Sequence, residues 1–148
     1  MRKVIQRTIR GDVKEQFLVR ATAGRNLNVK FIITHDHPKT SSHIAIGILA
    51  SQRAKVTVDA VTIIRPSAPD SQAWLEIRAV ASDDAVIAAA PNLEIYNNAV
   101  KAGHALTTKH ISDIELFYLT SRGLNPRQAQ KLIIDAALKP FRKAQVIS

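Results

Sequence analysis

Residues Pro91–Gly123 read PNLEIYNNAVKAGHALTTKHISDIELFYLTSRG, and this stretch marks a change from strand-like to helical sequence. Its first part alternates apolar and polar residues through Leu93 and Ile95, as a half-buried strand does. Its last part carries the signals of a helix start and a helix stop. We therefore expect a β region over residues 1–110 and a C-terminal helical hairpin over residues 111–148.

The first helix of this hairpin is predicted over about Asp113–Arg122. Ser112 stands at the N-cap position, and Glu115, three residues later, completes a capping box. Ile111 and Leu116 occupy the two positions of a hydrophobic staple. These signals agree with one another, so this helix is the best-specified element of the sequence.

The second helix begins just after the first one ends. Gly123 supplies the left-handed residue that ends the first helix, and Asn125 followed by Pro126 gives an N-cap and a first helical residue. The helix ends before Lys139-Pro140. Its apolar residues have helical spacing, so we expect them to pack on the β region: Ala129, Leu132, Ile133, Ala136 and Ala137.

The first hundred residues are repeatedly strand-like. Short runs rich in Val and Ile alternate with turn-like residues; the runs are Phe17–Ala23, Val29–Thr34, His43–Leu49, Val56–Ile64, Trp74–Val80 and Ala85–Ala88. This spacing fits a sandwich, a barrel or a β-helix, and periodicity alone does not choose among them. The sequence has no strict internal repeat, which argues against a regular solenoid.

Five motifs, in this order along the chain, resemble the SufB/SufD family, the scaffold subunits of the Suf system that assembles iron–sulfur clusters. They are His37-Pro-Lys-Thr-Ser-Ser42, Ser82-Asp-Asp-Ala85, Pro91-Asn-Leu-Glu-Ile95, Val100-Lys-Ala-Gly-His-Ala105 and Phe117-Tyr-Leu-Thr-Ser-Arg-Gly123. The resemblance implies a mainly β protein, a short right-handed parallel β-helix with a C-terminal α-helical hairpin. It also implies exposed edge strands at the ends of the β-helix, which a protein must cover or pair.

The same resemblance implies a non-enzymatic scaffold subunit. In that family the C-terminal helices dock a SufC-like ABC ATPase, and we assign Phe117, Tyr118 and Arg122 to this surface. Packing on the β region is the alternative for the two aromatic residues. The resemblance further implies pairing with a SufB/SufD-like subunit, or with a second copy of the chain as a homodimer.

His104 matches the histidine that SufD-like subunits bring to their interface with SufB, where a nascent cluster forms. A structural histidine that caps the β region is the alternative. Ala102 stands where SufD-like sequences usually carry Cys, and Ala105 where they usually have Gly. Because the chain has no cysteine, it cannot supply thiolates or accept sulfur as a persulfide. We therefore expect no intrinsic cofactor, and any iron–sulfur cluster would be shared with a partner subunit.

His35 and His37 are the candidates for a metal site. In an extended segment, residues two apart point to the same face, and imidazole suits zinc, iron or copper. A small His-ligated metal protein of cupin-like fold is therefore the alternative function. Pro38 interrupts the strand at this point, so the other interpretation is a turn in which His37, Thr40 and Ser41 bond the backbone.

Composition limits the remaining classes. The net charge is +9 and the pI is about 10.3, but the basic residues are scattered and aromatic residues are 5% of the chain, which argues against nucleic-acid binding. No run approaches the roughly 20 apolar residues of a membrane helix, so we expect a cytoplasmic protein with no membrane partner. No Walker loop or nucleophile elbow is present, so we predict no catalytic residues. Trp74 is expected in the core.

Overall fold

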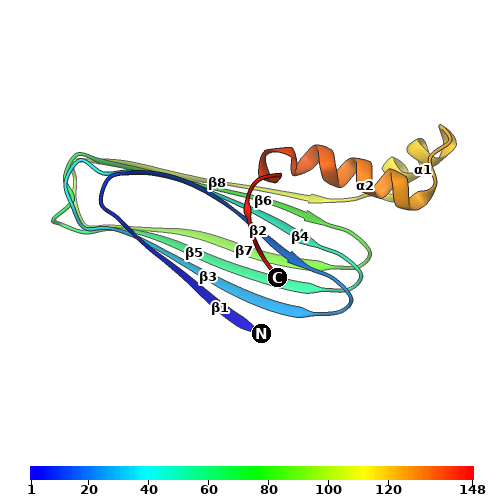
Figure 1. Cartoon of the computed structure of the whole chain (residues 1–148), viewed down its shortest axis with the longest axis horizontal. Coiled ribbons are helices and arrows are strands. Elements are labelled where there is room, and N and C mark those ends of the chain that lie inside the picture. Colours follow the sequence, from blue (N-terminus) through cyan, green and yellow to red (C-terminus); the bar gives the residue numbers. More distant parts are fainter.

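The computed structural model describes all 148 residues, Met1–Ser148, and places most of them in two parallel β-sheets. The odd-numbered strands form one sheet, in the order β1 (Arg2–Ile9), β3 (Asn26–His35), β5 (Lys55–Ile64) and β7 (Val86–Ile95). The other sheet has the order β8 (Val100–His110), β6 (Ser71–Ala81), β4 (Ser41–Ala50), β2 (Asp12–Ala21) and β9 (Gln145–Ile147). Strands β1 to β8 therefore alternate between two stacked layers (Figure 1).

The pairing of the strands selects the β-helix among the three architectures that the sequence allowed. Every strand pair is parallel, whereas sandwiches and jelly rolls are built from antiparallel strands. Asn26 lies opposite Lys55, 29 residues later, and Ser41 lies opposite Gln72, 31 residues later. The expected parallel β-helix is confirmed, although its coils vary in length.

The argument against a solenoid from the missing repeat was wrong, because burial repeats here rather than residue identity. Strands β3 and β5 have the same alternation of buried and exposed positions although their sequences differ. Buried residues from both sheets fill the interior, where Phe17 and Phe31 meet edge to face with ring centroids 5.2 Å apart. Such an interior needs apolar residues of roughly the right volume at alternate positions, and many sequences meet that need.

The amino-terminal end of the β-helix carries an inward ion pair. Arg7 pairs in register with buried Ile33, so its side chain faces the interior, where its Nε lies 3.0 Å from a Glu15 carboxylate oxygen. The Arg7 guanidinium also lies 5.4 Å from the centroid of the Phe17 ring. Strand β9 covers part of the β2 edge and places Ile147 in the core. Strand β1 and most of β2 keep a free edge at this end, and the inward Arg7–Glu15 pair disfavours burial of that end beneath another coil.

The two predicted helices are present as α1 (Asp113–Ser121) and α2 (Pro126–Ala137), followed by the 3₁₀ turn η1 (Lys139–Phe141). The Ser112 hydroxyl accepts a hydrogen bond from the Glu115 N–H at 3.2 Å, as expected of an N-cap. The Glu115 carboxylate instead accepts from Lys109 at 2.9 Å, so only half of that capping box forms. Gly123 is left-handed with a φ of +100°, as predicted. None of these helices combines the length and apolar character that a membrane crossing needs.

The C-terminal segment packs on the outer face of the even-numbered sheet, over the carboxyl ends of its strands (Figure 1). A second apolar cluster forms there around Val80, Leu138 and Phe141. Phe141 lies so close to Gly47 that a Cβ on that glycine would meet the ring at 2.9 Å. Ala129 is buried as predicted, but Leu132 and Ala136, which were also expected to pack, are exposed.

The cap of α2 gives a direct stability prediction. Asn125 accepts from the Gln128 N–H at 2.8 Å, and the Gln128 side chain accepts from the Asn125 N–H at 3.0 Å. Asn125→Ala removes the first of these bonds, so we expect the free energy of unfolding to fall by about 1 kcal/mol. Urea unfolding followed by far-ultraviolet circular dichroism measures it. Asn98→Ala, an exposed asparagine outside any helix, is the control; equal losses in both variants would contradict the capping box.

Candidate functional site

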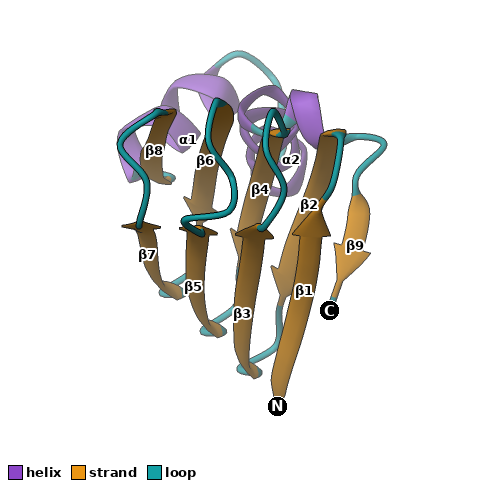
Figure 2. Cartoon of the chain, turned by 90° about the vertical axis from the view of Figure 1, so that its left-hand side faces the viewer, coloured by secondary structure: helices purple, strands orange, loops and turns teal.

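The carboxyl-terminal end of the β-helix is open. Strand β7 is the last strand of one sheet and β8 is the last strand of the other, so each has a neighbour on one side only (Figure 2). The free sides present backbone N–H and C=O groups that can pair with another strand. The amino-terminal end also has a free edge at β1, but it differs in its inward ion pair and in the cover that β9 gives to part of β2.

The inward positions of this last coil are apolar along β7 and include Ala102 and Leu106 together with polar His104 on β8, and they are only partly covered. Leu106 pairs in register with buried Ile77, and Leu93 pairs with buried Thr62, so both side chains lie on the interior side of their strands. No further coil covers them, and Leu106 is 43% exposed. On β7 the other inward positions are also apolar: Ile87, Ala89, Pro91 and Ile95. An apolar end face next to two free strand edges is typical of an interaction surface.

His104 lies on this end face. It is in the middle of β8, which continues to His110, inside the β region that the sequence predicts over residues 1–110. It pairs in register with buried Leu75, and its side chain therefore has the inward parity of the last coil, but it remains exposed. The next inward positions on either side are Ala102 and Leu106, so β8 offers no second ligand beside it.

A second exposed apolar surface lies on the helices. Ile114, Phe117 and Tyr118 follow the i, i+3, i+4 spacing along α1 and are 81%, 73% and 56% exposed. The packing alternative for Phe117 and Tyr118 is thus wrong. Leu116, the staple residue, is the one that packs toward the β-helix.

A groove runs between the two helices beside these residues. Ile114, Tyr118 and Leu119 line it from α1, and Ile133, Ala136 and Ala137 line it from α2. The Lys109–Glu115 ion pair stands at its edge, with 2.9 Å between the charged atoms. Arg122 lies with its guanidinium carbon 5.1 Å from the centroid of the Tyr118 ring, so its charge sits beside an exposed aromatic surface.

The structure separates the two candidate metal ligands. His35 is the last residue of β3 and is fully buried, with Nδ1 2.8 Å from the Thr40 hydroxyl and Nε2 2.8 Å from the Ser42 hydroxyl. The Thr40 hydroxyl donates to the His37 carbonyl, so a neutral ring with its proton on Nδ1 satisfies these contacts. The His37 ring is exposed and donates to Asp36 at 2.6 Å.

This geometry does not favour the cupin-like alternative. Both ring nitrogens of His35 already have partners, and no group of three or more His, Cys, Asp or Glu residues is placed to hold a metal ion. Parallel coils also differ from the antiparallel jelly roll of cupins. Of the turn residues His37, Thr40 and Ser41, only Thr40 bonds the backbone through its side chain as expected. The His37 ring donates to Asp36 instead, and the Ser41 hydroxyl donates to the Asp12 carboxylate.

Burial lowers the pKa of His35, while the nearby Asp36 carboxylate acts in the opposite direction. The hydrogen bond from His37, helped by Arg10, holds the pKa of Asp36 itself below its ordinary range. As pH falls through about 6.5, a histidine in the unfolded chain takes up a proton, whereas buried His35 resists protonation until a lower pH. The unfolded state then binds more protons, so stability decreases as the pH falls in this window.

We therefore expect the free energy of unfolding to decrease between about pH 7.5 and about pH 5.5, with His35 contributing a slope of at most about 1.4 kcal/mol per pH unit. His35→Gln should flatten the curve, and His43→Gln, at an exposed position, should leave the slope unchanged. Urea unfolding at a series of pH values measures both variants. An unchanged slope in His35→Gln would contradict this origin of the pH dependence.

Sequence reasoning missed two sets of residues. The inward apolar positions of the last coil, including Leu93 and Leu106, are recognisable once β8 is placed beside β6. Trp74 was expected in the core, but it is 43% exposed on the outer face of β6. Its strand position has the same parity as Glu76 and Arg78, a signal that the expectation overlooked.

The sequence of the chain is similar to that of known proteins over most of its length. Residues 3–137 match the family model described as SUF system FeS cluster assembly, SufBD core domain. An iron–sulfur cluster assembly SufBD family protein of Mycobacterium tuberculosis is 33% identical over 133 residues, which cover 84% of this chain and 34% of that protein. Bacillus subtilis SufB is 27% identical over 124 residues, covering 83% of this chain and 27% of its own length. Escherichia coli SufD is 50% identical over a shorter stretch of 46 residues, covering 31% of this chain and 11% of its own length. The chain spans about a third or less of the length of these curated relatives.

Proposed function

Because the chain belongs to the SufBD family of the SUF iron–sulfur cluster assembly system, we propose that it is a non-enzymatic scaffold subunit of that system. It pairs with a related subunit, or with a second copy, through the open end of its β-helix. It docks a SufC-like ABC ATPase through its C-terminal helices. The observation that carries this proposal is the presence of two separate exposed apolar surfaces, one on the last coil of the β-helix and one on the C-terminal helices.

The pairing surface is supported by the edges of β7 and β8. A partner coil placed on this end adds main-chain hydrogen bonds to two free edges and covers the inward apolar side chains, including Leu93 and Leu106. Both contributions favour association, because the hydrogen-bonding groups and the apolar surface are already exposed before it. A related β-helix has the same strand spacing and is therefore a suitable partner.

The docking surface is supported by the helix geometry. Ile114, Phe117 and Tyr118 form an exposed apolar row beside a groove between α1 and α2, and a helix of a partner can lie in such a groove. Aromatic side chains and arginine are the residue types that dominate binding energy at interfaces. Phe117, Tyr118 and Arg122 are thus the residues we assign to ATPase binding. The nucleotide is bound and hydrolysed by that partner.

His104 is the residue of the pairing surface that we propose as a metal ligand. Its exposed imidazole lies on the end face that the partner covers, where it can become a ligand to iron while a cluster is assembled. The cluster is cargo in this proposal, and cysteine ligands and sulfur acceptors come from the partner because this chain has none. His104→Ala should therefore leave pairing intact and lower the amount of cluster formed on the complex.

Reconstitution from purified components tests the proposal. The chain is mixed with the SUF-type ATPase and with the longer SufBD subunits of the same cells, and the mass of each complex is measured by size exclusion with light scattering. We expect one complex with the ATPase and one with a SufBD subunit or a second copy. A chain that stays monomeric and binds neither protein at micromolar concentrations would overturn it.

A further inference from the structure

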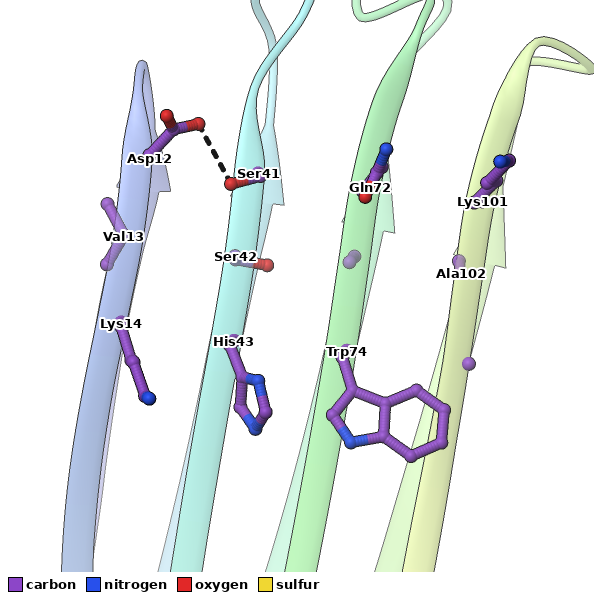
Figure 3. Close-up of a pocket in the computed structure, with 12 residues that line it drawn as sticks. Asp12, Val13, Lys14, Ser41, Ser42, His43, Gln72, Trp74, Lys101 and Ala102 are labelled. Carbon is purple, nitrogen blue, oxygen red and sulfur yellow. Dashed lines mark hydrogen bonds between the residues drawn. The ribbon is translucent and has the colours of Figure 1, made fainter.

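A hollow on the outer face of the even-numbered sheet lies outside the groove between the helices and shares only strand β8 with the proposed pairing surface. It lies over the first residues of β2, β4, β6 and β8, at the half of the sheet that the helices leave uncovered (Figure 1). Its volume is about 580 Å³, within the range of pockets that hold small ligands. Two rows of outward side chains from four neighbouring strands form its surface (Figure 3).

The second row of outward side chains, which contains Trp74, is set by the strand register. Lys14 lies opposite His43, His43 opposite Trp74, and Trp74 opposite Gly103, so a cation, an imidazole, an indole and a glycine follow one another across the sheet. A Cβ on Gly103 would meet the Trp74 ring at 2.6 Å. The indole therefore lies against the glycine backbone, which a larger residue there would prevent. The exposed indole offers a place for a planar group to stack.

Positive charge stands on both sides of this indole. Lys101 lies on β8, the next strand to one side, and Lys14 lies on β2, two strands to the other side. Two strand spacings are roughly 10 Å, and the flexible four-carbon stem of Lys14 can bring its ammonium part of that way toward a phosphate joined to a base on Trp74. The one carboxylate in the hollow, Asp12, accepts a hydrogen bond from the Ser41 hydroxyl at 2.8 Å (Figure 3).

We propose that this hollow binds a nucleoside monophosphate, with its base stacked on Trp74 and its phosphate at a flanking lysine. Stacking on an exposed aromatic ring tolerates any base, since every base has a π-face. A lysine ammonium attracts the phosphate as a point charge, and His43 lies between Lys14 and the indole as a further donor. The hollow opens on the outer face of the sheet and lies outside the helix groove, and it shares strand β8 with the proposed pairing surface, where Ala102 lines both.

The chain carries its own probe for this site, because Trp74 is its only tryptophan. Adenosine 5′-monophosphate should quench the fluorescence of the full chain with a saturable curve and a Kd on the order of 1 mM or below. Adenosine lacks the phosphate and inorganic phosphate lacks the base, so each should bind at least about tenfold more weakly than AMP. Absence of saturation by AMP, GMP, CMP and UMP up to about 10 mM would overturn the proposal.

Variants test the phosphate contacts and the base stacking separately. Lys14→Ala combined with Lys101→Ala should weaken AMP binding at least about tenfold and leave adenosine binding unchanged, whereas Lys55→Ala, an exposed lysine on the other sheet, should have no effect. Gly103→Ala should shift the emission of the free protein, because the ring must move, and should weaken AMP binding. Calorimetry on Trp74→Leu should show at least about a tenfold loss. Equal AMP affinity in Trp74→Leu and in the unchanged chain would also overturn the proposal.

Discussion

Replacing both Phe117 and Tyr118 with alanine should abolish stable binding of the SUF-type ATPase. These residues are 73% and 56% exposed, so their truncation removes contacts to a partner rather than contacts of the fold. Two aromatic interface residues cost about 2 kcal/mol or more each, and their effects are not additive. We expect a combined loss of about 3 kcal/mol, more than a 100-fold increase in Kd. Calorimetric titration of the ATPase into the purified chain measures it.

Tyr96→Ala is the matched control for this experiment. Tyr96 is also 56% exposed, but it follows β7, away from the two helices. Circular dichroism should show that the double variant and the control both keep the helix content of the unchanged chain. If the double variant binds the ATPase as tightly as the control does, α1 is not the docking surface.

A charge at Leu106 should prevent pairing through the open end of the β-helix. In Leu106→Asp the isolated chain keeps its fold, because Leu106 is 43% exposed and no coil covers it. In the paired state the carboxylate would be buried beneath the partner coil, with His104 and Thr108 as its inward neighbours on β8 and with no lysine or arginine at the inward positions of this coil. We expect at least about a 100-fold weaker association, about 3 kcal/mol, measured by analytical ultracentrifugation with the SufBD partner or with the chain alone.

Thr107→Asp is the control for the pairing experiment. Thr107 is the next residue on the same strand, but it pairs in register with Arg78 and therefore has the outward parity of β8. Thr107→Asp therefore introduces the same charge at the same edge without placing it in the proposed interface. Equal loss of association in both variants would mean that general charge repulsion at the edge, and not burial of the inward face, explains the result.

The sequence predicted the elements whose signals are local. The caps at Ser112 and Asn125 and the left-handed Gly123 depend on neighbouring residues only, and the structure has them where the sequence indicates. The strands of the β region follow from runs of Val and Ile, which favour extended backbone. The parallel β-helix itself came from the family resemblance, because periodicity left three architectures open.

The features that the sequence did not predict depend on contacts between distant residues. Strand β8 contains Ala102, Gly103 and Ala105, which have low strand propensity, and it forms because its backbone pairs with β6. The juxtaposition of Trp74 and Gly103 requires the register of two coils, 29 residues apart. The two histidines at 35 and 37 do not share a face because β3 ends at the first of them, so alternation no longer applies to the second.

Purification of the tagged chain from its own cells tests the scaffold function most directly, with the bound proteins identified by mass spectrometry and the iron content measured in the same sample. We expect a SUF-type ABC ATPase and a SufBD subunit to be recovered with the unchanged chain. We expect the ATPase to be lost from the Phe117→Ala, Tyr118→Ala double variant and the SufBD subunit to be lost from Leu106→Asp. Recovery of the unchanged chain without either protein would contradict a scaffold function in iron–sulfur cluster assembly.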